Sequence, residues 1–239
     1  MNDAGALPVM PESRGNLSLR GLWEVFLKPS SFFEELRERP KILVPYIVLA
    51  GLWLGMFFLL GDLILKMQME SPQFQQQMES SGVEMSGDML FIMKMNTLVF
   101  GSIAMLLVPL LAAALALFFG NFVMAGKTTF RKLLSAMLYG EIVYAVGSWV
   151  VVPMVLAKQS LLVGLSLGFL AASQGLQSAT YLALSKISVF GIWEIVAVGI
   201  GLSIMYGFSR NKGYLLAVLS MGLLSVLHVI TMAISSAIV

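Results

Sequence analysis

The sequence of 239 residues contains no cysteine and a single histidine, His228. Without cysteine, the chain has no disulfide, no thiolate metal site and no cysteine nucleophile, and one histidine excludes any site that needs two. Charged residues are also scarce, because they make up 12% of the chain against about a quarter in an ordinary globular protein. So few charges leave the surface of a water-soluble protein of this size uncovered.

Apolar side chains are correspondingly abundant. Hydrophobic residues make up 58% of the sequence, and the mean hydropathy is +0.88. This composition predicts an integral membrane protein whose immediate partner is the lipid bilayer. The formal net charge of +2 is too small to indicate a nucleic-acid partner, so we expect none.

Five stretches are long and apolar enough to cross a bilayer, which takes about 20 residues of helix. They cover residues 42–65, 97–124, 133–156, 187–208 and 214–238. We therefore expect an all-α integral membrane protein with five transmembrane helices in a bundle. A sixth apolar piece, residues 161–172, is too short to span and is rich in glycine and serine, so we expect an interfacial or re-entrant segment there.

The lysines and arginines between these stretches predict the orientation of the bundle. Eleven of the 15 fall on one side if the five stretches alternate in direction. They are Arg14, Arg20, Lys28, Arg37, Arg39, Lys41, Lys127, Arg131, Lys132, Arg210 and Lys212. By the positive-inside rule, the chain is a multi-pass protein of the inner (cytoplasmic) membrane, with its N-terminus cytoplasmic and its C-terminus extracytoplasmic. We expect no cleavable signal peptide, since about 40 polar or amphipathic residues precede the first apolar run.

The chain divides into three predicted parts. Residues 1–17 read as a disordered tail, residues 18–40 as cytoplasmic interfacial amphipathic helices, and residues 41–239 as the five-span membrane domain. In the middle part, Pro29 ends a first helix, and Ser31 and Glu34 match a capping box that starts a second.

These two amphipathic helices have aromatic side chains on one face and basic residues on the other. The candidates for an interfacial or partner-docking role are Trp23, Phe26, Phe32 and Phe33. One interpretation is a docking platform for a cytoplasmic partner. The other is a segment that only lies on the inner leaflet and anchors the bundle, since amphipathicity does not distinguish lipid from protein.

Three ionisable residues fall well inside the predicted spans: Glu141, Glu194 and His228. Charges in hydrocarbon are costly and usually face the interior of a bundle. Counted from the turn between the last two spans, Glu194 and His228 lie at nearly equal depth, so a contact between them is plausible. Such a pair is either a structural clamp between two helices or a proton-responsive or substrate-conducting site.

Methionines concentrate in the loop between the first two spans. Met67, Met69, Met93 and Met95 form two M-x-M patterns, and thioethers are soft ligands for Cu(I), which makes this a weak candidate metal site. The simpler interpretation is that methionine, a good helix former, extends the two spans into an outer helical hairpin. We favour the hairpin and expect no metal and no cofactor.

Several short segments, in this order, resemble the bacterial form of the Yip (Rab/Ypt-interacting protein) domain family. They are residues 23–29 (WEVFLKP), 32–40 (FFEELRERP), 130–135 (FRKLLS), 187–193 (ISVFGIW) and 199–202 (GIGL). The resemblance covers about residues 20–235 and implies a five-span membrane domain without catalytic residues. Eukaryotic members are associated with Rab GTPases in the Golgi and endoplasmic reticulum, whereas some bacterial relatives are encoded with ABC-type exporters and act as accessory or assembly subunits.

The sequence thus favours a non-enzymatic inner-membrane accessory or scaffold protein, with another membrane complex such as an ABC-type exporter as its partner. Two alternatives remain open. One is a small transporter, channel or lipid-moving protein that uses Glu141, Glu194 and His228. The other is a homo-oligomer that organises the bilayer through its interfacial helices.

Overall fold

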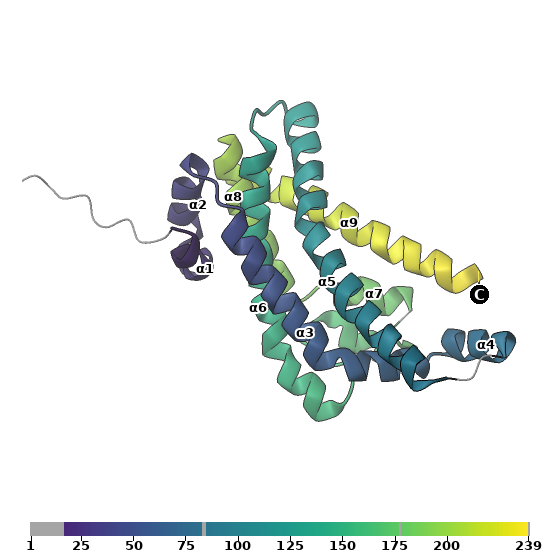
Figure 1. Ribbon diagram of the computed structural model, residues 1–239. Coiled ribbons are helices and arrows are strands. Elements are labelled where there is room, and N and C mark those ends of the chain that lie inside the picture. Colours follow the sequence, from purple (N-terminus) through teal and green to yellow (C-terminus); the bar gives the residue numbers. More distant parts are fainter. Residues whose placement is uncertain (1–16, 83–84, 177, 239) are drawn as a thin grey trace, which may run out of the picture.

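The computed structural model describes residues 17–82, 85–176 and 178–238, and over these residues the chain is helical throughout apart from loops and one isolated bridge between Ser166 and Ser188 (Figure 1). In chain order the elements are α1 (Leu17–Leu27), α2 (Pro29–Glu38), α3 (Leu43–Met69), α4 (Pro72–Ser81), α5 (Gly87–Phe118), the π-helix η1 (Phe119–Val123), α6 (Phe130–Lys158), the 3₁₀ helix η2 (Leu167–Gln174), α7 (Ala179–Ser185), α8 (Val189–Tyr206) and α9 (Arg210–Ile238). The predicted disordered tail, apart from Leu17 in α1, lies outside the described residues.

Five helices are long and apolar enough to cross a membrane, which confirms the expected all-α, five-span architecture. The spans are Leu43–Met69, Gly87–Val123, Phe130–Lys158, Val189–Tyr206 and Arg210–Thr231. The second span begins ten residues before its predicted start at residue 97. The Met-rich segment there is helical itself and is capped by Ser86, whose hydroxyl accepts a hydrogen bond from the Met89 N–H at 3.2 Å.

The two ends of the bundle differ in character. The turns that carry Lys127 and Arg131, and Arg210 and Lys212, lie together at the top of Figure 1, and we call this the basic end. The opposite end, the loop end, carries α4, η2 and α7 (Figure 1). The grouping of basic turns agrees with alternating spans, while the side of the membrane that the basic end faces stays a prediction.

Helix α6 is the centre of the bundle. Every residue from Leu133 to Val143 is buried, on all faces of the helix, because α3, α5, α8 and the N-terminal helices surround it. Helices α6 and α8 approach closely at Gly140, where a Cβ atom would collide with the Val198 side chain. A glycine at such a crossing lets two backbones approach more closely than any larger residue would.

The two N-terminal helices pack on the side of the bundle, along α6 and α8, rather than beyond the ends of the spans (Figure 1). Phe32 and Phe33 are 1% and 0% exposed, and the Phe32 ring packs edge-on against Tyr139 with centroids 4.8 Å apart. Phe33 lies against Gly201 of α8. These two phenylalanines are therefore core residues and are not available as the docking residues that the sequence suggested.

The second helix starts earlier than the capping-box prediction. This helix begins at Pro29, so the proline lies in its first turn, and no side chain forms a capping hydrogen bond there. The Ser31 hydroxyl instead donates to the Lys28 carbonyl at 3.2 Å. The capping-box prediction is wrong because proline, which lacks an N–H and has a helical φ, suits the first turn of a helix.

Two arginine side chains at the basic end connect α2 with α8 and α9. The Arg210 guanidinium donates to the Ile200 carbonyl at 3.2 Å, to the Ser203 hydroxyl at 3.0 Å and to the Ser30 hydroxyl at 3.0 Å. Arg37 donates to the Ile204 carbonyl at 3.4 Å. Carbonyls in the last two turns of α8, which also accept hydrogen bonds from Ser203 and Gly207, thus receive additional donors from α9 and from α2.

The loop end is built largely from helices. Met67 and Met69 belong to α3 and Met93 and Met95 to α5, and α4 lies between them, so the segment is mostly helical, as the simpler interpretation of the methionines expected. The Met67 thioether accepts a hydrogen bond from the Leu161 N–H at 3.4 Å. The short apolar stretch 161–172 is a loop followed by η2, and together with α7 it closes this end of the bundle.

Candidate functional site

The candidate site begins with two buried carboxyl groups. Glu141 of α6 and Glu194 of α8 are 5% and 7% exposed, and their side chains share a hydrogen bond. A carboxylate can only accept, so a hydrogen bond between two carboxyl groups requires a proton on one of them. The pair therefore holds at least one proton, and two carboxyl groups that share a single proton are the usual carboxyl dyad.

The cationic side chain that interacts electrostatically with this pair is Lys186, which caps the C-terminal end of α7 shortly before α8. It lies within electrostatic range of both Glu141 and Glu194. Desolvation lowers the pKa of its ammonium group, and the two carboxyl groups act against that shift. Lys186 is thus placed to balance a single negative charge on the pair.

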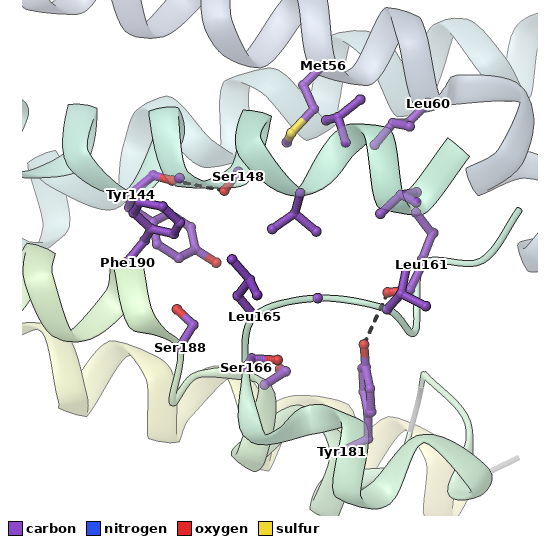
Figure 2. Close-up of a pocket in the computed structure, with 17 residues that line it drawn as sticks. Met56, Leu60, Tyr144, Ser148, Leu161, Leu165, Ser166, Tyr181, Ser188 and Phe190 are labelled. Atoms are coloured by element: carbon purple, nitrogen blue, oxygen red, sulfur yellow. Dashed lines mark hydrogen bonds between the residues drawn. The ribbon is translucent and has the colours of Figure 1, made fainter. Parts of the chain in front are cut away.

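A cavity of about 220 Å³ lies directly beyond the pair, toward the loop end (Figure 2). Its wall on α6 is formed by Tyr144, Ser148, Val151 and Val155, which follow Glu141 at steps of three or four residues. These residues share one helix face, so Glu141 lies one turn below the floor of the cavity. On α8 the same relation holds between Phe190, which lines the cavity, and Glu194.

Most polar groups around the cavity are already satisfied. The Tyr181 hydroxyl donates to the Leu161 carbonyl at 3.2 Å, Ser148 donates to the Tyr144 carbonyl at 3.0 Å, and Ser188 accepts from the Gly191 N–H at 2.9 Å. These bonds fix the loop and the start of α8 as a rigid wall. Figure 2 shows the first two as dashed lines.

Tyr144 is the exception among them. Its side chain reaches into the cavity with the hydroxyl directed toward Leu165 and Ser188 (Figure 2). Among the described residues this hydroxyl makes no hydrogen bond, and it lies within electrostatic range of both Glu141 and Glu194. It is therefore a free donor and acceptor between the cavity and the carboxyl pair.

A second unpaired polar group lies in the same layer as the carboxyl pair. Trp53 of α3 is 1% exposed, and its indole N–H has no hydrogen-bond partner within the described part of the chain. Its ring packs against Tyr144 with centroids 6.3 Å apart, one turn below the cavity residue Met56. A buried donor without a partner costs about 1–3 kcal/mol.

The third ionisable residue that the sequence singled out lies elsewhere. His228 is on the exposed side of α9, and Glu194 faces α6, so the expected contact between Glu194 and His228 is replaced by the contact between Glu194 and Glu141. Figure 1 shows α9 diverging from the rest of the bundle toward its C-terminal end. The depth of a residue along its span does not determine which way its side chain points around the helix.

The sequence did not predict that Glu141 and Glu194 meet. One signal was present, namely Gly140 directly before Glu141. The close α6–α8 crossing at Gly140 and Val198 brings Glu141, the residue after Gly140, near Glu194, which lies one turn from Val198 on α8. A glycine beside an intramembrane carboxylate therefore indicates that another helix crosses closely at that level.

The remaining partner-docking candidates lie on the outer side of α1. Trp23 is 70% exposed and Phe26 is half-buried. An apolar groove of about 570 Å³ lies between Phe26 and the start of α8. The α8 residues that line it are Val189, Phe190, Ile192 and Trp193. We call Trp23, Phe26 and this groove the aromatic side surface.

Comparison with known proteins agrees with this architecture. The Yip1 domain matches residues 23–233, which covers α1 to α9 almost completely. The chain is also 25% identical over 219 residues to "Membrane protein YknW" of Bacillus subtilis (strain 168), a match that covers 90% of this chain and 91% of that protein. No solved structure matches. With nearly its whole length matched, from the N-terminal helix pair through the last span, the chain belongs to the Yip1 domain family.

Proposed function

We propose that this Yip1-family membrane protein is a non-enzymatic accessory subunit that binds another membrane complex through its aromatic side surface. The single observation that supports this role is the groove between α1 and α8, which is concave and apolar and has Trp193 and Phe26 in its walls. Aromatic side chains around a pocket are typical of the centres of protein interfaces.

The packing of the N-terminal helices supports the same proposal. Val25, Phe32 and Phe33 fix α1 and α2 to the bundle, while Trp23 and Leu27 on the other side of α1 are 70% and 64% exposed. A segment that only anchored the bundle to the inner leaflet would not need to be held rigidly by the core. A rigid and exposed aromatic face is pre-organised for binding, which lowers the entropy cost of association.

The partner class to test first is an ABC-type exporter, which the family resemblance implies. The test is affinity capture from gently solubilised native membranes, followed by mass spectrometry of the intact complex. We expect stoichiometric recovery of exporter subunits, and we expect the double variant Trp23→Ser, Phe26→Ser to lose them. The matched control is Phe58→Ser, on a residue of α3 that is 69% exposed and does not line the groove.

Two results would contradict the accessory role. One is recovery of this chain alone, as a monomer or homo-oligomer, from membranes that contain the exporter. The other is equal loss of the partner in Phe58→Ser and in the double variant, because the aromatic side surface would then have no special part in binding.

A second candidate function, a small transporter or lipid-moving protein, is favoured by the cavity and the carboxyl pair beneath it. Of the three residues that such a protein would use, Glu141 and Glu194 are in contact with each other, whereas His228 lies on the exposed side of α9. Reconstitution of the pure protein into liposomes tests this candidate. Flux that disappears in Glu194→Gln would support it, and the absence of flux of ions and lipids would refute it.

A further inference from the structure

We infer that Glu141 and Glu194 form a proton-binding site that exchanges its proton with water in the cavity at the loop end. This inference is independent of the accessory role, because it concerns the buried carboxyl pair and the cavity rather than the exposed aromatic side surface, although Phe190 lines both the cavity and the groove. The ligand is a hydrated proton. Its site is the hydrogen bond between the two carboxyl groups.

The first argument is the placement of the pair below the cavity. Tyr144 and Phe190 form the floor, and Glu141 and Glu194 lie one helical turn below them on the same two helices. The opposite wall of the cavity is the non-spanning loop between α6 and η2, so the cavity lies toward the loop end of the bundle. A cavity of about 220 Å³ holds several water molecules, each of which occupies about 30 Å³ in the liquid.

The second argument is that two polar groups near the floor of the cavity have no hydrogen-bond partner among the described residues. The Tyr144 hydroxyl projects into the cavity, and the Trp53 indole N–H, at 1% exposure, has no partner among the described residues. Native proteins seldom leave such donors unpaired, so one or two water molecules are expected beside them. These waters, with the Tyr144 hydroxyl, would complete a hydrogen-bonded path to the pair.

The third argument is the charge balance of the site. The titratable groups within electrostatic range of the pair are Tyr144 from α6 and Lys186 from the α7–α8 junction. Tyr181 of α7 interacts with Tyr144, and His228 of α9 interacts with Lys186. With one proton bound, the pair carries one negative charge, which the Lys186 ammonium balances. Proton release leaves two adjacent carboxylates against one ammonium, and a second bound proton leaves Lys186 without a counter-charge, so the singly protonated state is the resting state.

The exchange step is a simple proton transfer. On release, the O–H bond of the protonated carboxyl group breaks as an O–H bond forms on a cavity water, which becomes hydronium. On binding, hydronium returns the proton to a carboxylate and becomes water again. No other bond changes and no oxidant or reductant is involved.

Infrared difference spectroscopy of the purified, bilayer-reconstituted protein tests the inference. We expect the carbonyl stretching band of a buried protonated carboxyl group, which shifts when the buffer is changed from water to heavy water. Glu141→Gln and Glu194→Gln should each lose this band, since a single carboxyl group no longer shares a proton with a second. The control Glu79→Gln, on the exposed face of α4, should keep it.

The route of exchange is tested by filling the cavity. Val151→Phe places a ring inside it, and we expect slower hydrogen–deuterium exchange of the carboxyl band. Val150→Phe, one residue earlier and 53% exposed on the outside of α6, is the matched control and should exchange at the wild-type rate. Both measurements use a variant that keeps the carboxyl pair, so they remain informative if either glutamine variant fails to fold.

Three results would overturn the inference. The first is a wild-type protein without a protonated-carboxyl band. The second is a band that survives in both glutamine variants or exchanges equally fast in Val151→Phe and Val150→Phe. The third is loss of the band on addition of Na⁺ at constant pH, which would make the site a metal-cation site. None of these results bears on capture of a partner complex, so the proposed accessory role is tested separately.

Discussion

Docking of the N-terminal helices is the interaction whose strength the structure lets us estimate best. We consider Phe33→Ala. Phe33 is 0% exposed and lies between α2 and Gly201 of α8, so its truncation removes the central contact that fixes α2 to the bundle. The matched control is Phe58→Ala on α3, where the ring is 69% exposed and little packing is lost.

The cost follows from the cavity that the truncation leaves. In a water-soluble core, Phe→Ala costs about 3–5 kcal/mol, of which part is transfer of the ring from water. Here an undocked α2 keeps its ring in lipid, so the transfer part largely cancels and the packing part remains. A void of roughly 100 Å³ at about 24 cal/mol per Å³ gives about 2.4 kcal/mol, or roughly a sixtyfold change in the docking equilibrium. Partial collapse of the void reduces this value, so we expect at least about a tenfold change.

The assay uses a single cysteine in a chain that has no other. Leu36 is 0% exposed on the same face of α2, so in a Leu36→Cys background a thiol reagent reacts only when α2 undocks. We expect labelling of Leu36→Cys to be at least about tenfold faster with Phe33→Ala and unchanged with Phe58→Ala. Equal labelling rates in the two double variants would refute the conclusion that Phe33 holds α2 on the bundle.

Further variants test other parts of the structure. Gly140→Leu should prevent the close approach of α6 and α8, because even a Cβ there collides with Val198, and we expect loss of folded, monodisperse protein in size-exclusion chromatography. Asp62→Asn breaks the 2.6 Å ion pair with Lys94, but Asp62 is 82% exposed, so we expect at most about 1 kcal/mol in a chemical-denaturation curve. The pKa of Lys186 is lowered in the folded protein, so between that pKa and 10.5 the unfolded chain binds more protons than the folded one. Thermal stability should therefore rise with pH across this interval. The variant Lys186→Gln should abolish the rise.

The spans could be predicted because their signal is local. A run of about 20 apolar residues has few alternatives to a membrane helix, and the five predicted stretches match the five long helices. The errors occurred where composition changes gradually. The second span begins at Gly87 because polar and methionine residues continue the helix beyond the hydrophobic run, and α2 begins at Pro29 because proline is favoured in a first helical turn.

The carboxyl pair and the burial of Phe32 and Phe33 could not be predicted in this way. Hydropathy gives the depth of Glu194 in the membrane, but its partner depends on the rotation of α8 against α6, and that is determined by the close contact of Gly140 with Val198. Likewise, an amphipathic helix needs an apolar surface without specifying lipid or protein. Phe33 packs against Gly201, which comes much later in the sequence.

This separation along the chain has a consequence for biosynthesis. Residues of α2 leave the ribosome first, yet the surface that receives them, with Gly201, Ile204 and Arg210, is made some 170 residues later. At about 5–20 residues per second, α1 and α2 wait roughly 10–30 seconds before their binding surface exists. Until α8 is made, only lipid, α3 and α6 can cover the apolar face of the two helices, so their amphipathic character lets the membrane surface hold them temporarily. Complete docking of this helix pair onto protein is therefore a late step of folding.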